Sequence, residues 1–278
     1  MKPTEFEEVS LEEYKAQAQA HWSDAPCGSN YARSELMSKE FFEEVEAHRY
    51  GISPWLLESI KSFNVRGKKV LEVGFGMGTD HLSLAREGGI MYGIDLSPRH
   101  AEICKRRLEV YGFGCGPSLG DAENMPFRDN TFDFVYSFGV VHHSPKTGKI
   151  ISEIHRVLKP GGRCFVAVYH KNSICFWWTI FFYRYLLRQG FRKRTLKQEL
   201  SLIEYPKNNE NIYVKLFKRG EFARLFDGFS SRKSHIRQLL PIDIWFFSRF
   251  FAEPEKPTPF LTKVGSWFGW YVVVEAEK

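Results

Sequence analysis

The sequence predicts a doubly wound α/β domain, in which helices cover both faces of a mostly parallel sheet. Three observations support this fold class. Strand-like and helix-like segments alternate between residues 65 and 170, the apolar run 70–73 breaks into three glycines, and the next apolar run ends in Asp95. Such alternation is typical of βαβ units, and these sheets bind ligands where their parallel strands end.

The elements of this core, residues 65–170, follow from periodicity and from helix start and stop signals. Ser97 and Pro98 are suited to an N-cap and a first helical position, and the run from Lys159 to Gly162 ends a helix and opens a strand. We expect strands near 69–74, 90–95, 115–120, 132–137 and 162–169, and helices near 79–88, 98–111 and 147–158.

Three further segments flank this core. Residues 1–64 are predicted to form an N-terminal helical cap, with a loop over 22–28. Residues 171–219 form an aromatic and then basic insertion expected to cover the substrate. Residues 220–278 return to the sheet, with a helix near 221–226 and strands near 231–239 and 270–275.

Composition and charge limit the class of protein. The 278 residues are 43% hydrophobic and 26% charged, which is typical of a globular chain, and 16% aromatic, with 25 Phe. Twelve acidic and five basic residues give residues 1–60 a net charge of −7, whereas ten basic and three acidic residues give 184–219 a charge of +7. The apolar run 174–187 is shorter than the roughly 20 residues that span a bilayer.

The five cysteines are odd in number and show no C-x-x-C spacing, so we expect free thiols in a reducing compartment. The first residues are acidic and lack the apolar core of a secretory signal. Both features favour a cytoplasmic location. No metal site is predicted.

The glycines at 74, 76 and 78 indicate a nucleotide-type site. Glycine is required where a ligand lies against bare backbone or where φ is positive, and the helix that follows offers free N–H groups. Gly78 comes one residue too early for the dinucleotide motif G-x-G-x-x-G, and no phosphate-binding P-loop motif is present. A tight strand–helix turn without a ligand is the alternative.

The run E-x-G-x-G-x-G, from Glu72 to Gly78, resembles the first motif of class I S-adenosylmethionine-dependent methyltransferases. Together with 91–97, 120–127, 132–145 and 153–162, it resembles the broad group that includes ubiquinone and menaquinone methylases. The resemblance implies a seven-stranded sheet with an antiparallel last strand and S-adenosylmethionine as cofactor. It also implies cofactor contacts for Glu72, Gly74, Gly76 and Gly78, but it does not specify the acceptor.

Two acidic positions are expected to complete the cofactor site. Asp95, followed by Leu96, ends a strand 17 residues after Gly78 and can accept hydrogen bonds from both ribose hydroxyls. The resemblance gives Asp121 and Ala122 the contacts to adenine. A surface carboxylate for Asp95 and a helix N-cap for Asp121 are the structural alternatives.

The fourth block places the chemistry. The backbone after Ser137 is expected to pass near the transferable methyl, and His142 or His143 lies where the acceptor enters, with His142 preferred as a base. Either histidine can instead serve packing. Tyr31, Arg49 and Tyr50 are candidate partners for the methionine carboxylate or the acceptor, and Tyr50 is assigned to the cofactor.

These features predict methyl transfer to a small organic acceptor of aromatic or lipophilic character. Motifs of amine, cytosine-C5 and arsenite methylases are missing, which makes a nucleic-acid partner unfavoured. Two alternatives remain: an RNA- or ribosome-modifying methylase that uses 184–219, and a cofactor-binding protein without catalysis. A peripheral membrane contact through 174–197 stays open, and so does the oligomeric state.

Overall fold

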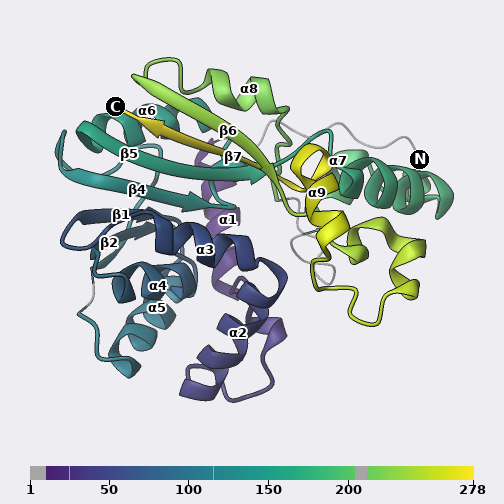
Figure 1. The fold of residues 1–278 in the computed structure, drawn as a ribbon, viewed down its shortest axis with the longest axis horizontal. Coiled ribbons are helices and arrows are strands. Elements are labelled where there is room, and N and C mark those ends of the chain that lie inside the picture. Colours follow the sequence, from purple (N-terminus) through teal and green to yellow (C-terminus); the bar gives the residue numbers. More distant parts are fainter. Residues whose placement is uncertain (1–10, 25, 115, 204–211) are drawn as a thin grey trace.

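A seven-stranded sheet in the order β3-β2-β1-β4-β5-β7-β6 forms the centre of the computed structural model, which describes residues 11–24, 26–114, 116–203 and 212–278 (Figure 1). Its strands are β1 (Lys69–Val73), β2 (Ile90–Asp95), β3 (Pro117–Leu119), β4 (Phe132–Phe138), β5 (Leu158–Tyr169), β6 (Ser231–Arg237) and β7 (Tyr271–Glu277). β1 to β5 pair in parallel, and β7 runs antiparallel to both β5 and β6. The predicted fold class is confirmed.

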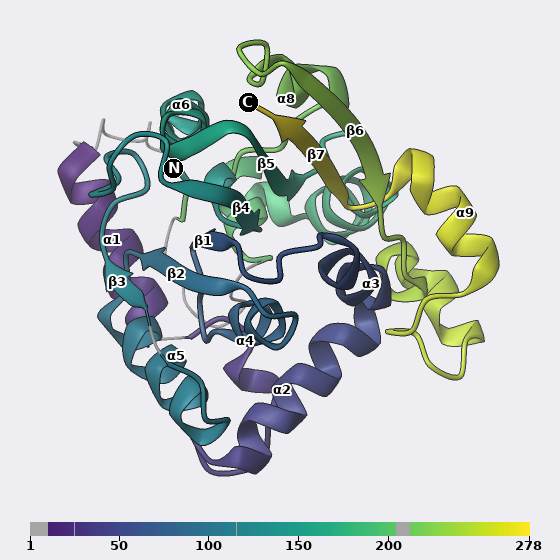
Figure 2. The same cartoon turned by 60° about the vertical axis from the view of Figure 1, so that its left-hand side comes forward.

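Helices cover both faces of this sheet (Figures 1 and 2). The α-helices are α1 (Leu11–Asp24), α2 (Lys39–Ile52), α3 (Pro54–Ser62), α4 (Thr79–Arg86), α5 (Pro98–Val110), α6 (Thr147–Val157), α7 (Leu196–Ser201), α8 (Arg219–Arg224) and α9 (Pro259–Phe268). The 3₁₀ segments are η1 (Ser29–Tyr31), η2 (Val141–His143), η4 (Gly190–Arg192) and η5 (Pro241–Phe250), and η3 (Cys175–Leu187) is a π-helix.

The alternation of side chains along the strands divides the core into two layers. On one face, Leu71 and Val73 of β1 pack in a cluster with α6 and α8. On the other face, Val70 packs with α3 and α4. Glu72 shares the face of Val70, because successive side chains of a strand point to opposite sides, and it therefore points toward α4. The first strand thus brings an acidic side chain beneath the helix that follows the glycines.

The structure differs from the expected elements at several boundaries. β5 begins at Leu158 rather than near 162, because the Lys159–Gly162 run belongs to the strand itself. Trp22 lies in α1, which continues to Asp24, so the predicted loop 22–28 is wrong for its first residues. Position 115 of the expected third strand lies outside the described residues. These shifts leave the order of elements unchanged.

The insertion and part of the C-terminal segment together form one end of the molecule, where η3, α7, η5 and α9 lie together on the right of Figure 1. Phe176 and Ile180 of η3 pack with Tyr169, Leu200 and Trp270 in a separate apolar cluster. No helix in the described residues has both the length and the apolar character needed to cross a bilayer.

Candidate cofactor and acceptor site

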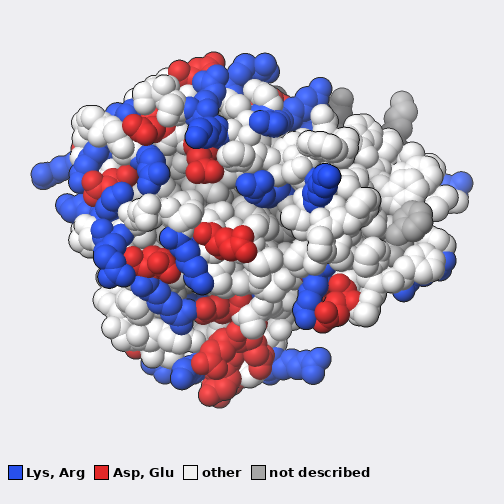
Figure 3. Space-filling view, in the orientation of Figure 1, with Lys and Arg blue, Asp and Glu red and all other residues white. Residues whose placement is uncertain are grey.

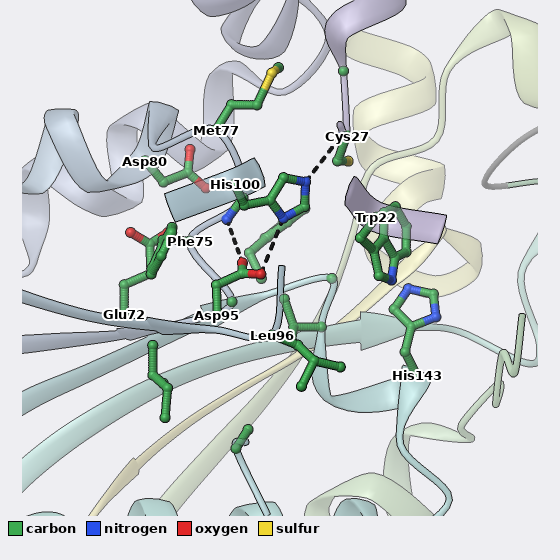
Figure 4. Close-up of a pocket in the computed structure, with 18 of the residues that line it drawn as sticks. Trp22, Cys27, Glu72, Phe75, Met77, Asp80, Asp95, Leu96, His100 and His143 are labelled. Atoms are coloured by element: carbon green, nitrogen blue, oxygen red, sulfur yellow. Dashed lines mark hydrogen bonds and ion pairs between the residues drawn. The ribbon is translucent and has the colours of Figure 1, made fainter. Parts of the chain in front are cut away.

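A cavity of about 320 Å³ opens at the carboxyl ends of the parallel strands (Figure 4). Segments that follow β1, β2, β3 and β4 line it, and so does the end of β5. Residues of α1 and α2 form its other walls. This is the position at which a doubly wound sheet binds its ligand, because strand ends and helix N-termini meet there.

The three glycines after β1 serve different purposes. Gly76 has a φ of +52°, lines the cavity, and an added Cβ there would meet nothing within 4 Å. Gly78, at the N-cap of α4, has a φ of +75°, and an added Cβ would lie 2.6 Å from Cys104 Sγ of α5. Gly74 lines the cavity next to Val140. The structure therefore places Gly74 and Gly76 in the lining of the cavity, and Gly78 at a contact between α4 and α5.

Asp95 fixes the end of β2 to its neighbours. One carboxylate oxygen accepts the Gly76 N–H at 2.9 Å, and the other accepts the Ser97 N–H at 2.9 Å and lies 3.2 Å from His100 Nδ1. His100 Nε2 accepts a hydrogen bond from the Cys27 N–H at 3.4 Å, so in the neutral ring Nδ1 carries the hydrogen and donates a hydrogen bond to Asp95. Figure 4 shows His100 between Asp95 and Cys27. Asp95 and Leu96 both line the cavity.

Glu72 lies at the floor of the cavity and contacts a histidine of α4. Its Oε2 is 2.9 Å from His81 Nδ1, and both side chains are buried. Burial, with the charge of Asp80, raises the pKa of Glu72 well above its ordinary value, and burial lowers the pKa of His81 to about 4. The environment thus favours the neutral form of each group, and one hydrogen links them.

The loop after β3 is held by α1. Lys15 Nζ lies 2.5 Å from Asp121 Oδ2 and 2.8 Å from Glu123 Oε2. Asp121 also accepts the Glu123 N–H at 2.8 Å within a turn, and no helix follows, so the N-cap alternative for Asp121 is wrong. Asp121 and Ala122 line the cavity, as do Lys15 and Glu123.

An ion pair joins α2 to the first turn of α4. Arg49 donates to both carboxylate oxygens of Asp80, at 2.8 and 2.5 Å, and its guanidinium lies 4.6 Å from the centre of the Phe138 ring. Burial would raise the pKa of Asp80, but the charge and hydrogen bonds of Arg49 and the hydroxyls of Tyr136 and Tyr50 lower it below its ordinary value. Arg49, Asp80 and Phe138 line the cavity.

Tyr50 and Ser137 have structural partners and lie outside the cavity lining. The Tyr50 hydroxyl contacts Asp80 at 3.0 Å and Ser83 at 2.7 Å, and burial raises its pKa. The Ser137 hydroxyl donates to the Val73 carbonyl at 2.9 Å and ties β4 to β1. Neither side chain reaches the position expected for a cofactor contact, although the backbone that follows Ser137, residues 138–140, does line the cavity.

The two histidines of η2 have opposite orientations. His142 is fully buried, its ring lies 4.2 Å from that of Tyr169, and neither ring nitrogen has a hydrogen-bond partner among the described residues. Burial and the nearby His143 lower its pKa well below 6.5. His143 lines the cavity, and its Nδ1 lies 3.0 Å from the Tyr213 carbonyl. The preference for His142 is therefore corrected in favour of His143, because only His143 faces the cavity.

Several lining residues escaped prediction, because their segments carry no motif. Tyr14 and Trp22 of α1 cover the cavity, with the Tyr14 hydroxyl bonded to the His143 carbonyl and the Trp22 ring 5.4 Å from that of His143. Tyr169, at the end of β5, and Tyr271, at the start of β7, also line it. The aromatic content of the chain was the only signal that could have pointed to this wall.

These residues fit S-adenosylmethionine. The bare backbone at Gly76 opens onto the cavity, Asp95 offers acceptors at the end of β2, and Asp121 with Ala122 lies after β3. A ribose and an adenine ring require this order of groups along the strand ends. Among the described residues no group of three or more His, Cys, Asp or Glu side chains could hold a metal ion.

Comparisons with known proteins agree with this geometry. Residues 71–166 match the family model described as a methyltransferase domain. The chain is 37% identical over 108 residues to phosphoethanolamine N-methyltransferase 2 of Caenorhabditis elegans, covering 38% of this chain and 25% of that protein. It is 34% identical over 134 residues to a fatty-acid O-methyltransferase of Mycolicibacterium smegmatis, covering 48% of each. It therefore spans less than half the length of these curated relatives.

A solved structure extends the likeness beyond the core. Geranyl diphosphate C-methyltransferase of Streptomyces coelicolor, in complex with S-adenosyl-L-homocysteine, superposes with a TM-score of 0.58 at 14% identity, over 95% of this chain and 98% of that one. The chain therefore shares the fold of this methyltransferase. Residues 71–166 are the part of this chain that matches the methyltransferase domain, and S-adenosyl-L-homocysteine is the ligand bound in that solved structure.

Proposed function

We propose that this protein transfers a methyl group from S-adenosylmethionine to a small acceptor with an apolar or aromatic body. The observation that carries the proposal is the acceptor side of the cavity. The cavity that holds the glycine loop is also lined by five aromatic side chains, Tyr14, Trp22, Phe138, Tyr169 and Tyr271. Aromatic walls favour apolar or planar ligands and exclude water from the reacting groups.

The cofactor supplies an electrophilic methyl on a positively charged sulfur. The chain positions it: the backbone at 74–76 supports it, Asp95 accepts from the ribose, and Asp121 with Ala122 holds the adenine. Displacement in line needs little further chemistry, because holding donor and acceptor in contact accounts for much of the rate enhancement.

His143 is our candidate for taking a proton from the acceptor. The Tyr213 carbonyl only accepts hydrogen bonds, so Nδ1 of His143 carries the hydrogen. In the neutral ring, Nε2 is then the basic nitrogen. An acceptor hydroxyl or amine bonded to Nε2 would lose its proton as the methyl arrives. A His143→Gln variant should lower kcat and leave cofactor affinity unchanged.

The relatives share the domain but differ in acceptor. One is named for fatty acids, which agrees with an apolar acceptor, and another is named for phosphoethanolamine, which is polar. The proposed acceptor class is therefore supported mainly by the aromatic residues that line the cavity of this chain. An exchange of Tyr169 for a smaller apolar residue should change which acceptors react, because this ring closes the acceptor side.

The test uses S-adenosylmethionine with an isotopically labelled methyl and a panel of acceptors. The panel contains a long-chain fatty acid, a sterol, a prenyl diphosphate, phosphoethanolamine and total RNA. Label in an apolar acceptor, lost in Asp95→Asn, supports the proposal. Label in RNA alone would replace it with the RNA-modifying alternative. Tight cofactor binding without transfer to any acceptor, in the panel or in a cell extract, would favour the non-catalytic one.

A further inference from the structure

Most of the large apolar side chains exposed in the described residues lie outside the methyltransferase domain. Of the sixteen such side chains that the structure describes, twelve belong to η3, η4, η5 and α9, and we call the surface of these four elements the aromatic lobe. Phe250, Phe260 and Trp267 are 70%, 73% and 64% exposed. Soluble monomers rarely gather this much apolar surface at one end without a partner for it.

The elements that carry the exposed rings of η3 and α9 pack on the rest of the protein through their inner faces. Phe176 and Ile180 bury the inner side of η3, and Leu261 does so for α9. The hydroxyl of Thr179 donates to the Asp243 carbonyl at 2.5 Å and joins η3 to η5. The outward rings therefore have a fixed support and are presented to solvent as a set.

The outward side chains form rows along these elements. On η3 the exposed Trp178 stacks on the exposed Phe182 at 5.2 Å, one helical turn away. On η5 the Arg249 guanidinium lies 3.4 Å from the centre of the Phe246 ring and 5.2 Å from that of Phe250. Aromatic rings beside cationic groups are typical of the interface between water and lipid.

The charge of the lobe is positive along η3 and η4. Residues 184–203 carry six Lys or Arg and a single acidic residue, Glu199. Glu199 is buried and pairs with Arg184 and Arg194. Arg188, Arg192 and Lys193 are exposed, and none of them has an ion pair with another described residue. The end of the molecule on the right of Figure 3 is uncharged over most of its area, with Lys and Arg, and one group of Asp and Glu, at its edge.

From these observations we infer that the aromatic lobe docks on the surface of a membrane that contains anionic phospholipid. The rings enter the interfacial region, and the cations at the end of η3 contact the headgroups. No described helix can cross the bilayer, so the contact is peripheral. A second copy of the chain fits less well, because a two-fold contact through this face would oppose the same cations.

The lobe is continuous with the acceptor side of the cavity. Trp270 belongs to the apolar cluster under η3, and its ring stacks at 4.5 Å on that of Tyr169, which lines the cavity. Docking would therefore bring the acceptor side of the cavity near the lipid, if the proposed function holds. Membrane binding itself is measured without cofactor or acceptor, so the two proposals can fail separately.

The first test is sedimentation of the full chain with vesicles. Phosphatidylcholine vesicles containing about 30% phosphatidylserine should pellet the protein, and raising the salt from about 0.1 to about 0.5 M should weaken binding. The triple variant Phe250→Ser, Phe260→Ser, Trp267→Ser should lower the partition coefficient by about tenfold or more, because it removes interfacial apolar area. A control variant with Ile90→Ser and Leu119→Ser, which are 50% and 52% exposed on β2 and β3, should bind as the wild type does.

The second test separates charge from apolar contact. The triple variant Arg188→Gln, Arg192→Gln, Lys193→Gln should lose the preference for phosphatidylserine over pure phosphatidylcholine. A charge-matched control replaces exposed cations of the other elements with glutamine, at Lys61, Arg66 and Lys105. All these positions are exposed, so thermal unfolding should show folded variants.

Three results would overturn the inference. The lobe and control variants could sediment equally with vesicles. The chain could bind polyuridylic acid but no vesicle, which would assign the cations to RNA. The wild type could fail to bind vesicles and instead form a concentration-dependent dimer, measured by sedimentation velocity, that the lobe variants abolish. That result would show that the exposed rings contact a second copy of the chain.

Discussion

Replacing Asp95 with asparagine removes one of its acceptor oxygens without changing its size. The carboxylate of the wild type holds two backbone N–H groups, of Gly76 and Ser97, and the ring of His100. The amide nitrogen of asparagine cannot accept from any of these donors or from a ribose hydroxyl. The change therefore weakens both the support of the glycine loop at Gly76 and the predicted hydrogen bonds to the ribose.

The magnitude follows from the type of hydrogen bond. A hydrogen bond to a charged group contributes roughly 1.5–3 kcal/mol, and a buried donor left without its partner costs a similar amount. We expect the free energy of cofactor binding to weaken by about 1–3 kcal/mol, which is about a 5- to 150-fold rise in Kd. Asp95 is almost fully buried, so solvent does not replace the lost acceptor.

The assay is calorimetric titration with S-adenosyl-L-homocysteine, which binds without turnover. Asp133→Asn is a matched control, because Asp133 also accepts a backbone N–H, that of Lys69 at 2.9 Å, and pairs with Lys159 at 2.6 Å. It lies at the start of β4, at the opposite end of the sheet from the cavity, and should leave Kd unchanged. A folded Asp95→Asn protein that binds within twofold of the wild type would refute the ribose assignment.

Three further outcomes follow from the same structure. Gly78→Ala should lower the free energy of unfolding by about 2 kcal/mol or more, because the new methyl group meets Cys104 and φ is positive. Gly76→Ala should lower it by only about 1 kcal/mol and mainly weaken cofactor binding. If the two variants changed the free energy of unfolding and the cofactor Kd equally, the different roles given to the two glycines would be contradicted. Burial lowers the pKa of His142, so the unfolded chain takes up a proton on this ring as the pH falls below 6.5 and the folded chain does not. The wild type should therefore lose stability relative to His142→Phe as the pH falls from 6.5 to 5, with a slope that approaches about 1.4 kcal/mol per pH unit, and parallel curves would show that the native ring does take up the proton. Lys15→Met should speed hydrogen exchange of α1 and leave the sheet unchanged, since it removes both contacts to the loop after β3, and unchanged exchange would show that other contacts hold the helix.

The local motifs predicted those parts of the site that directly follow the strands of the sheet. The glycine run, Asp95 and Asp121 follow consecutive strands, and parallel strands bring their carboxyl ends to one edge of the sheet. That rule alone predicts that Gly76, Asp95 and Asp121 lie together, and all three line the same cavity. Their contacts to the ligand remain predictions, and the titration above tests one of them.

Side-chain direction could not be foretold in the same way. His142 and His143 are neighbours with the same chemistry, yet one packs against Tyr169 and the other faces the cavity. A short 3₁₀ turn decides this, and its orientation depends on packing rather than on the two residues themselves. Tyr50 was expected at the cofactor for its position in the cap, but Asp80 and Ser83 hold its hydroxyl away.

By itself the sequence determined the order of strands and helices along the chain, the class of fold and the loop that lines the cavity after β1, because periodicity and glycine spacing act over a few residues. Only the tertiary structure decided which elements close the cavity. Lys15 meets Asp121 across 106 positions of sequence, and Tyr14 meets His143 across 129. Such contacts depend on how helices pack over the sheet, and no local pattern in α1 records the residues it will cover.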